Sequence, residues 1–235
     1  MIDYPDIVKK VRLSTALIFV LDANGDVIGA GSGFVFIKKG MLVTCNHVVA
    51  GAHGCLINFF DPTQTLRGRV ILNDAEHDLA LIAFSDDSRA PLLMGKMENV
   101  IEGISVIFSS YRLNVKCLTT RPGVLFSITK NAAGLTTYLI DGAVCGGDSG
   151  CPLIDSSGGV IGVVNARRVV REDVLEKIRD TKTGLVPVDL IKIYHGLMGN
   201  LHLGVGYAIP ASYIPGIAPT GLLSAARSSS QKGLT

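Results

Sequence analysis

A serine in a glycine-rich segment is the residue of this 235-residue chain best suited to be a nucleophile. Ser149 lies in the segment GGDSGCP at residues 146–152. Glycines permit a tight loop in which successive backbone N–H groups turn toward one exposed hydroxyl. Because a serine hydroxyl is a poor nucleophile by itself, catalysis also needs an imidazole that accepts its proton and donors that bind the developing oxyanion. A histidine and a carboxylate elsewhere in the chain must therefore complete such a site.

His47 and Asp78 are the two residues that meet this need. His47 follows the apolar run 41–45 and begins a short helical turn, which places its imidazole at the edge of a loop. Asp78 precedes the apolar run 79–84, so we expect its carboxylate at the mouth of a buried strand, within reach of an imidazole N–H. Asp74 is the competing carboxylate, and we assign it to the preceding turn. The alternative for His47 is a structural histidine satisfied by local hydrogen bonds.

The elements that must position these residues are strands. Short runs rich in β-branched and aromatic residues are separated by Gly, Pro and Asn, and Asn24-Gly25 predicts a hairpin. The first set of runs lies at residues 12–21, 27–38, 41–45, 55–60, 67–73 and 79–84. The second set lies at 104–109, 113–119, 123–129, 136–140, 151–155, 159–165 and 204–209. The pattern predicts an all-β protein with two strand sets joined by a linker between residues 85 and 97.

Two segments depart from the β pattern. Residues 171–180 and 188–198 carry apolar residues at helical spacing, so we expect two amphipathic helices within an insertion at about 167–203. Residues 224–235 are rich in Ser and Gly and predict a flexible tail. The expected organisation is therefore a first β unit at 1–94, a second at 95–223 and the tail.

Charge and composition exclude several classes of partner. The chain has 22 Lys and Arg against 20 Asp and Glu, scattered along its length, so we expect neither nucleic acid nor a membrane as partner. The apolar run 15–21 is too short to cross a bilayer and no signal peptide precedes it, which favours a cytoplasmic location. The five cysteines lack metal-ligand spacing, so we expect buried thiols and no metal or cofactor.

Five motifs in sequence order resemble the trypsin-like serine proteases, and most closely their HtrA/Deg branch. They are GSGF at 31–34, TCNHVV at 44–49, DLAL at 78–81, GDSGCPL at 147–153 and GVGYAIP at 204–210. Five concordant motifs are stronger evidence than any one of them. The resemblance implies two six-stranded antiparallel β-barrels with the active cleft between them. It also implies a triad of His47, Asp78 and Ser149, with the backbone N–H groups of Gly147 and Ser149 as oxyanion donors.

The resemblance also implies a substrate pocket. Its floor is expected near Ala143 and Val144, and its wall near Asn165, Ala166 and Arg167. Because none of these residues is a carboxylate, we expect cleavage after small or aliphatic side chains in a peptide or unfolded protein. Relatives in this branch usually carry a PDZ domain after the protease, which we do not expect within this chain. By analogy with the family, a homo-oligomer is allowed.

Asp148 departs from the HtrA/Deg branch, which commonly has Asn before the nucleophile. In extracellular trypsins an Asp at this position pairs with a newly freed α-amino group. No matching start is evident before residue 13, so we expect an internal partner for Asp148, with Arg121, Arg167 and Arg168 as candidates.

Three alternatives to a general serine endopeptidase remain. The first is a non-catalytic relative that binds peptides in the cleft, although no member of the triad is missing. The second is a viral or self-processing protease of the same fold. The third is a thiol enzyme that uses Cys145 or Cys151, neither of which occupies the position where the loop N–H groups converge.

Overall fold

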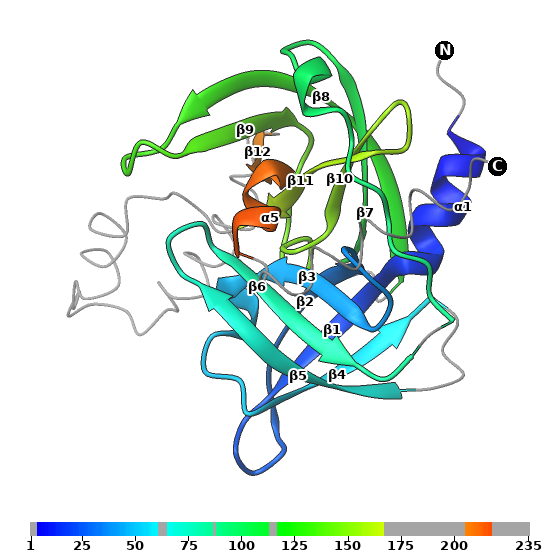
Figure 1. Ribbon diagram of the computed structural model, residues 1–235, viewed down its shortest axis with the longest axis vertical. Coiled ribbons are helices and arrows are strands. Elements are labelled where there is room, and N and C mark those ends of the chain that lie inside the picture. Colours follow the sequence, from blue (N-terminus) through cyan, green and yellow to red (C-terminus); the bar gives the residue numbers. More distant parts are fainter. Residues whose placement is uncertain (1–3, 61–64, 87, 113–116, 167–204, 218–235) are drawn as a thin grey trace, which may run out of the picture.

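Two closed antiparallel β-barrels make up the computed structural model, one from each half of the chain (Figure 1). The structure describes residues 4–60, 65–86, 88–112, 117–166 and 205–217. The first barrel comprises β1 (Thr15–Leu21), β2 (Val27–Val35), β3 (Met41–Cys45), β4 (Gly54–Phe59), β5 (Thr65–Asp74) and β6 (Leu79–Phe84). The second comprises β7 (Ser105–Tyr111), β8 (Leu118–Lys130), β9 (Thr136–Asp141), β10 (Pro152–Asp155), β11 (Val160–Asn165) and β12 (Val205–Pro210). The predicted all-β fold of two six-stranded barrels is confirmed.

The two barrels share one strand order. The first closes as β1-β2-β3-β6-β5-β4, and the second closes in the equivalent order β7-β8-β9-β12-β11-β10. Each barrel has its own apolar core, because alternate side chains of its strands point inward. A third apolar cluster, which includes Phe34, Leu81, Ile107 and Ile209, fills the junction between the barrels. This junction cluster fixes the position of one barrel relative to the other.

The start of the chain corrects the first predicted strand. Residues Pro5–Ser14 form the helix α1, and β1 begins only at Thr15. Pro5 suits the first helical turn, Asp6 complements the positive end of the helix dipole and Arg12 the negative end. Val11 is buried and belongs to the junction cluster. The prediction of a strand from residue 12 was wrong because residues 12–14 form the last turn of this helix, and an apolar run does not by itself show where a helix gives way to a strand.

The long strand β8 corrects two further predictions. The runs 113–119 and 123–129 were expected to be separate strands, but residues Leu118–Lys130 form one strand, and residues 113–116 lie outside the described part. Pro122 was read as a strand break. It pairs with β7, whereas pairing with β9 starts only at Val124. Since Pro122 lies beyond the end of β9, its missing N–H costs the sheet little.

Short helices complete the described structure. They are α2 (Asn46–Val49), the 3₁₀ helices η1 (Met97–Asn99) and η2 (Ala211–Tyr213), and α5 (Ile214–Ile217). No helix within the described ranges is both long enough and apolar enough to cross a bilayer. The predicted helices at 171–180 and 188–198 and the tail at 224–235 lie outside the described residues.

Candidate active site

Strand pairing in the first barrel brings His47 and Asp78 together. β3 and β6 are antiparallel neighbours, and their register places Cys45 opposite Leu79. Asn46 and His47 continue directly from β3 into α2, while Asp78 directly precedes β6. The Asn46 N–H donates to the Asp78 carbonyl, at 3.0 Å, and closes this end of the sheet. The two residues therefore share one barrel edge although 31 positions separate them.

The structure brings the three predicted triad residues into hydrogen-bond contact. His47 Nδ1 lies 2.7 Å from Asp78 Oδ2, and His47 Nε2 lies 2.9 Å from Ser149 Oγ. The His47 backbone N–H also donates to Asp78 Oδ1, at 2.8 Å. The two side-chain distances, 2.7 Å between His47 and Asp78 and 2.9 Å between His47 and Ser149, are typical of an orienting carboxylate, a base and a nucleophile that act in series.

Asp74, the competing carboxylate, is the last residue of β5, where the β5–β6 turn begins. Its oxygens accept hydrogen bonds from the backbone N–H groups of Glu76 and His77, and its Oδ2 lies 2.7 Å from His77 Nδ1. Asp74 thus stabilises the turn that leads to Asp78, as the sequence predicted, and bonds to a different histidine.

The segment around Ser149 is a tight loop that only glycine permits at two positions. Gly147 and Gly150 have φ angles of +94° and +87°, which L side chains rarely adopt. A Cβ at Gly150 would also meet the Ser32 carbonyl oxygen. Within the described part of the chain, the N–H groups of Gly147 and Ser149 have no hydrogen-bond acceptor. Both predicted oxyanion donors are therefore available to a ligand.

Ser32 of β2 holds this loop against the first barrel. Its N–H donates to the Ser149 carbonyl at 2.8 Å, and its Oγ donates to the Gly147 carbonyl at 2.7 Å. The same Oγ accepts from the Tyr111 N–H, at 3.0 Å. The small residues at 29–33 thus let the nucleophile loop approach the backbone of β2 closely. The contribution of Ser32 itself was missed, and a lone hydroxyl among small apolar residues is the only sequence signal for it.

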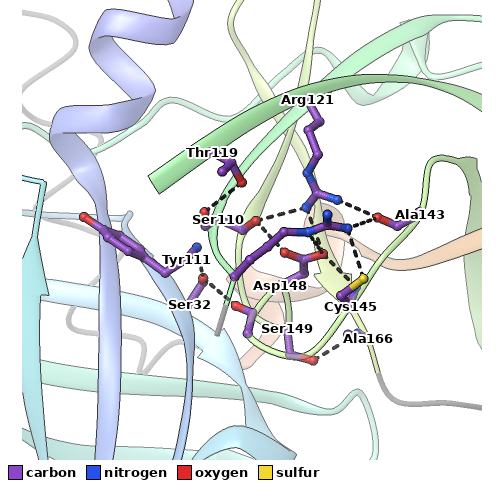
Figure 2. Close-up of polar contacts among 12 residues, drawn as sticks. Ser32, Ser110, Tyr111, Thr119, Arg121, Ala143, Cys145, Asp148, Ser149 and Ala166 are labelled. Carbon is purple, nitrogen blue, oxygen red and sulfur yellow. Dashed lines mark hydrogen bonds and ion pairs between the residues drawn. The ribbon is translucent and has the colours of Figure 1, made fainter. Parts of the chain in front are cut away.

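Asp148 is a buried carboxylate with a full set of donors (Figure 2). Arg121 Nη2 lies 2.8 Å from Asp148 Oδ2, which also accepts from the Cys145 N–H at 2.7 Å. Ser110 Oγ donates to Asp148 Oδ1 at 2.6 Å. The prediction of an internal partner is confirmed for Arg121. Arg167 and Arg168 lie outside the described residues.

Two further groups contact the triad. Asn165 Nδ2 donates to Asp78 Oδ2 at 2.8 Å, so the carboxylate accepts from this amide as well as from His47. The Ala166 N–H donates to Ser149 Oγ at 3.0 Å. Asn165 was predicted only as a pocket wall. Its place at the end of β11 could have suggested contact with Asp78, but no sequence pattern distinguishes the two roles.

A cavity of about 310 Å³ opens beside Ser149. Its lining is mostly small and apolar and includes Ile28, Ala30, Val48, Gly146 and Ala166.

Of the other predicted pocket residues, Ala143, Val144 and Asn165 do not line this cavity. Val144 is buried against the second core, and the Ala143 carbonyl accepts from Arg112 and Arg121. Arg167 lies outside the described residues.

The two fully buried thiols near the site, Cys45 and Cys151, are poorly suited to chemistry. Burial, followed by the nearby Asp148 charge, raises the pKa of Cys151 well above its ordinary value. Burial and the Asp78 charge do the same to the pKa of Cys45, whose Sγ lies 3.3 Å from the Val164 carbonyl. Cys45, His47 and Asp78 present ligand atoms within 4.8 Å of one another. A buried thiol with a raised pKa is a weak metal ligand, so these residues do not fit a metal site.

Comparison with known proteins agrees with this geometry. The family described as "Trypsin-like peptidase domain" matches residues 31–163, more than half of the chain. Protease Do-like 1, chloroplastic, of Arabidopsis thaliana is 31% identical over 159 residues, which is 63% of this chain and 35% of the relative. Serine protease Do-like HtrA of Bacillus subtilis is 28% identical over 159 residues, or 62% of this chain and 35% of the relative. The chain thus spans about a third of the length of these curated relatives.

Solved structures share the fold. The HtrA-type protease AlgW with a tripeptide superposes with a TM-score of 0.69 at 21% identity, over 89% of this chain and 60% of that one. The active form of the Rv3671c protease from M. tuberculosis gives a TM-score of 0.67 at 22% identity, over 92% and 83% of the two chains. At these identities the likeness concerns the fold alone.

Proposed function

Because the chain belongs to the family of trypsin-like peptidase domains, we propose that it is a serine endopeptidase that cleaves peptide bonds through an acyl-enzyme on Ser149. The observation that carries the proposal is the continuous chain of contacts from Asp78 through His47 to Ser149, with distances of 2.7 and 2.9 Å. A peptide or an unfolded protein is the proposed substrate.

In the proposed reaction, Ser149 Oγ attacks the scissile carbonyl carbon while His47 Nε2 accepts the hydroxyl proton. The carbonyl π electrons move onto the oxygen of the tetrahedral intermediate. His47 then donates its proton to the leaving amine as the C–N bond breaks. Water repeats the sequence on the ester and releases Ser149.

Asp78 keeps His47 in the productive tautomer. A proton on His47 Nδ1 is shared with Asp78 Oδ2, which leaves Nε2 free to accept from Ser149. The carboxylate also stabilises the imidazolium that forms. The Asn165 amide and the His47 backbone N–H support Asp78 in this role, since each donates to one of its oxygens.

The oxyanion of the intermediate is proposed to bind the N–H groups of Gly147 and Ser149. Preorganised donors of this kind stabilise charge that exists only in the transition state. The Ser32 contacts and the Arg121–Asp148 ion pair support the proposal because they fix the loop from two sides.

We further propose cleavage after small or aliphatic residues. The expected floor residues, Ala143 and Val144, carry no charge. The guanidinium groups of Arg112 and Arg121 both donate to the Ala143 carbonyl, and among the described residues Asp148 is the carboxylate with which they form ion pairs. The net positive charge there disfavours a basic substrate side chain. Mapping the new termini in a digested, denatured proteome tests this preference, and a map dominated by Lys and Arg would contradict it.

A serine-directed fluorophosphonate followed by mass mapping tests the nucleophile. We expect one adduct, on Ser149, and neither an adduct nor peptide hydrolysis in Ser149→Ala. A folded wild-type protein that fails to react, or that reacts elsewhere, would exclude the mechanism. A wild type that binds peptides without hydrolysing them would favour a non-catalytic binding protein.

A further inference from the structure

A second Asp–His pair lies directly before Asp78 in the chain. His77 Nδ1 and Asp74 Oδ2 are 2.7 Å apart, and both side chains are largely buried, with 22% and 16% of their surface exposed. The proposed reaction does not use this pair, because its atoms bond to each other and to the turn. A histidine that is restrained in this way can hold the backbone of the residue that follows it, Asp78, in place.

Asp78 has a backbone that needs such support. Its φ is +54°, and among the described non-glycine residues only Ile37 shares a positive φ. This left-handed conformation is unfavourable for a residue with a Cβ, although less so for Asp than for most, and contacts around Asp78 help to hold it. On its C-terminal side, fully buried Leu79 of β6 fixes the chain. On its N-terminal side, the adjoining residue is His77.

His77 also reaches the second barrel. Its ring lies against the ring of Tyr213, with centroids 4.5 Å apart and an interplanar angle of 39°. Tyr213 ends η2, which follows β12, and its hydroxyl accepts from the N–H of Thr136 at the start of β9, at 2.9 Å. The turn that carries Asp78 is thus connected, through two side chains, to the barrel that carries Ser149.

We propose that His77 is a positioning residue: bonded to Asp74 and stacked on Tyr213, it holds the Asp78 turn in register with the second barrel. The inference rests on the proposed function, because its consequence is the alignment of His47 with Ser149. A misplacement of about 1 Å at such a contact can cost about a hundredfold in rate. Partial loosening of the turn is therefore expected to lower the rate about tenfold.

Three variants separate the two halves of this link. His77→Phe keeps a ring on Tyr213 and loses the bond to Asp74, whereas His77→Asn keeps an amide that can reach Asp74 and loses the ring. Tyr213→Phe keeps the ring and loses the bond to Thr136. Glu76→Gln is the matched control, because Glu76 is exposed in the same turn and only its backbone bonds to Asp74.

The first measurement is the second-order rate of Ser149 phosphonylation by a small fluorophosphonate, at a temperature where circular dichroism shows every variant folded. A small probe is needed because His77 and Tyr213 also line a cavity of about 520 Å³ that a longer substrate can enter. We expect about a tenfold loss in each link variant and less than twofold in the control. In the double variant His77→Asn/Tyr213→Phe the two losses should not multiply, because both substitutions interrupt the same link between the turn and the second barrel.

The second measurement is the far-downfield proton resonance of the His47–Asp78 hydrogen bond. It should shift or broaden in the link variants and stay unchanged in Glu76→Gln. This signal does not depend on hydrolysis. If the wild type shows the resonance but does not react with the probe, the proposed function fails and the resonance alone decides the role of His77. The proposal would be overturned if His77→Asn left both the His47–Asp78 proton resonance and the phosphonylation rate unchanged. It would also be overturned if the losses in rate multiplied in the double variant.

Discussion

Arg121 Nη2 lies 2.8 Å from Asp148 Oδ2, and the Asp148 side chain is fully buried beside the nucleophile. An internal guanidinium therefore neutralises the carboxylate that precedes Ser149. The Arg121 guanidinium also lies 4.4 Å from the centre of the Phe108 ring, which adds a cation–π contact on its other face. The nucleophile loop is thus attached to β8 and β7, two strands of its own barrel.

Removal of the guanidinium should destabilise the protein and disorder the loop. Arg121→Met deprives a buried carboxylate of its nearer ion-pair partner, and breaking a buried pair in this way typically costs about 3 to 5 kcal/mol. We expect that loss in urea unfolding and a large fall in fluorophosphonate reactivity. Arg112→Met is the matched control, because the Arg112 Nε lies 3.6 Å from Asp148 and should matter less.

The double variant Arg121→Met/Asp148→Asn sharpens this prediction. It removes both charges and should recover much of the lost stability. A double variant that is less stable than Arg121→Met would show that the ion pair is not the reason for the loss.

Activity should not require a newly freed N-terminus. Asp148 already has four donors or partners inside the fold, so no α-amino group is needed to order the loop. Protein with a chemically blocked N-terminus should be fully reactive when first purified. A blocked protein that is inert until limited proteolysis would contradict this activation logic.

The two carboxylates near His47 and His77 should differ sharply in their effect on catalysis. Asp78→Asn removes the acceptor that orients His47 and should lower kcat about 10⁴-fold with the fold intact. Asp74→Asn should cost about tenfold, because it acts only through the position of the turn. Steady-state kinetics on one peptide substrate compares them, and the reverse order would mean that the carboxylates were assigned to the wrong roles.

Asp74 should also contribute to acid stability. Burial raises the pKa of Asp74, but the hydrogen bonds from His77 and Glu76 lower it more, so the net pKa lies below the ordinary value. A folded-state pKa below the unfolded one stabilises the native state above the unfolded pKa, about 3.9, and this contribution disappears as the pH falls through the folded value.

The difference in unfolding free energy between wild type and Asp74→Asn should therefore be largest near neutral pH. It should shrink below about pH 4, where the unfolded chain takes up the proton first. Urea unfolding at a series of pH values measures it. A difference that grows toward low pH would exclude this origin.

The sequence predicted the two barrels and the meeting of three motifs at one edge between them, because both depend on local signals. Alternating apolar runs define strands, and the motifs around His47, Asp78 and Ser149 carry their own turns and glycines. Contacts between distant strands were harder to predict from the sequence. Ser110 and Ser32 look like ordinary strand residues, yet their hydroxyls bond to Asp148 and Gly147. Asn165 and Tyr213 likewise gain their roles only when the two barrels meet.

The boundaries that were wrong have a similar origin. Residues 12–14 adjoin the apolar run of β1 and were assigned to its strand, but Pro5 and the junction between the barrels favour a helix that continues to Ser14. Pro122 favours a break in a strand because it has no N–H. Here no residue of β9 lies opposite Pro122, so β9 needs no hydrogen bond from it. In both places the neighbouring element, rather than the local propensity, decided the conformation.

The junction cluster has a consequence for biosynthesis. Val11 of α1 packs in one cluster with Ile154, Val160 and Ile214, which lie some 140 to 200 positions later in the chain. Because α1 precedes both barrels in the chain, it can reach its final contacts only after the second barrel has been made. Contacts between such distant positions slow folding and leave apolar surface exposed meanwhile. The first barrel can close early, but α1 must wait for the second barrel, so the junction cluster should form last.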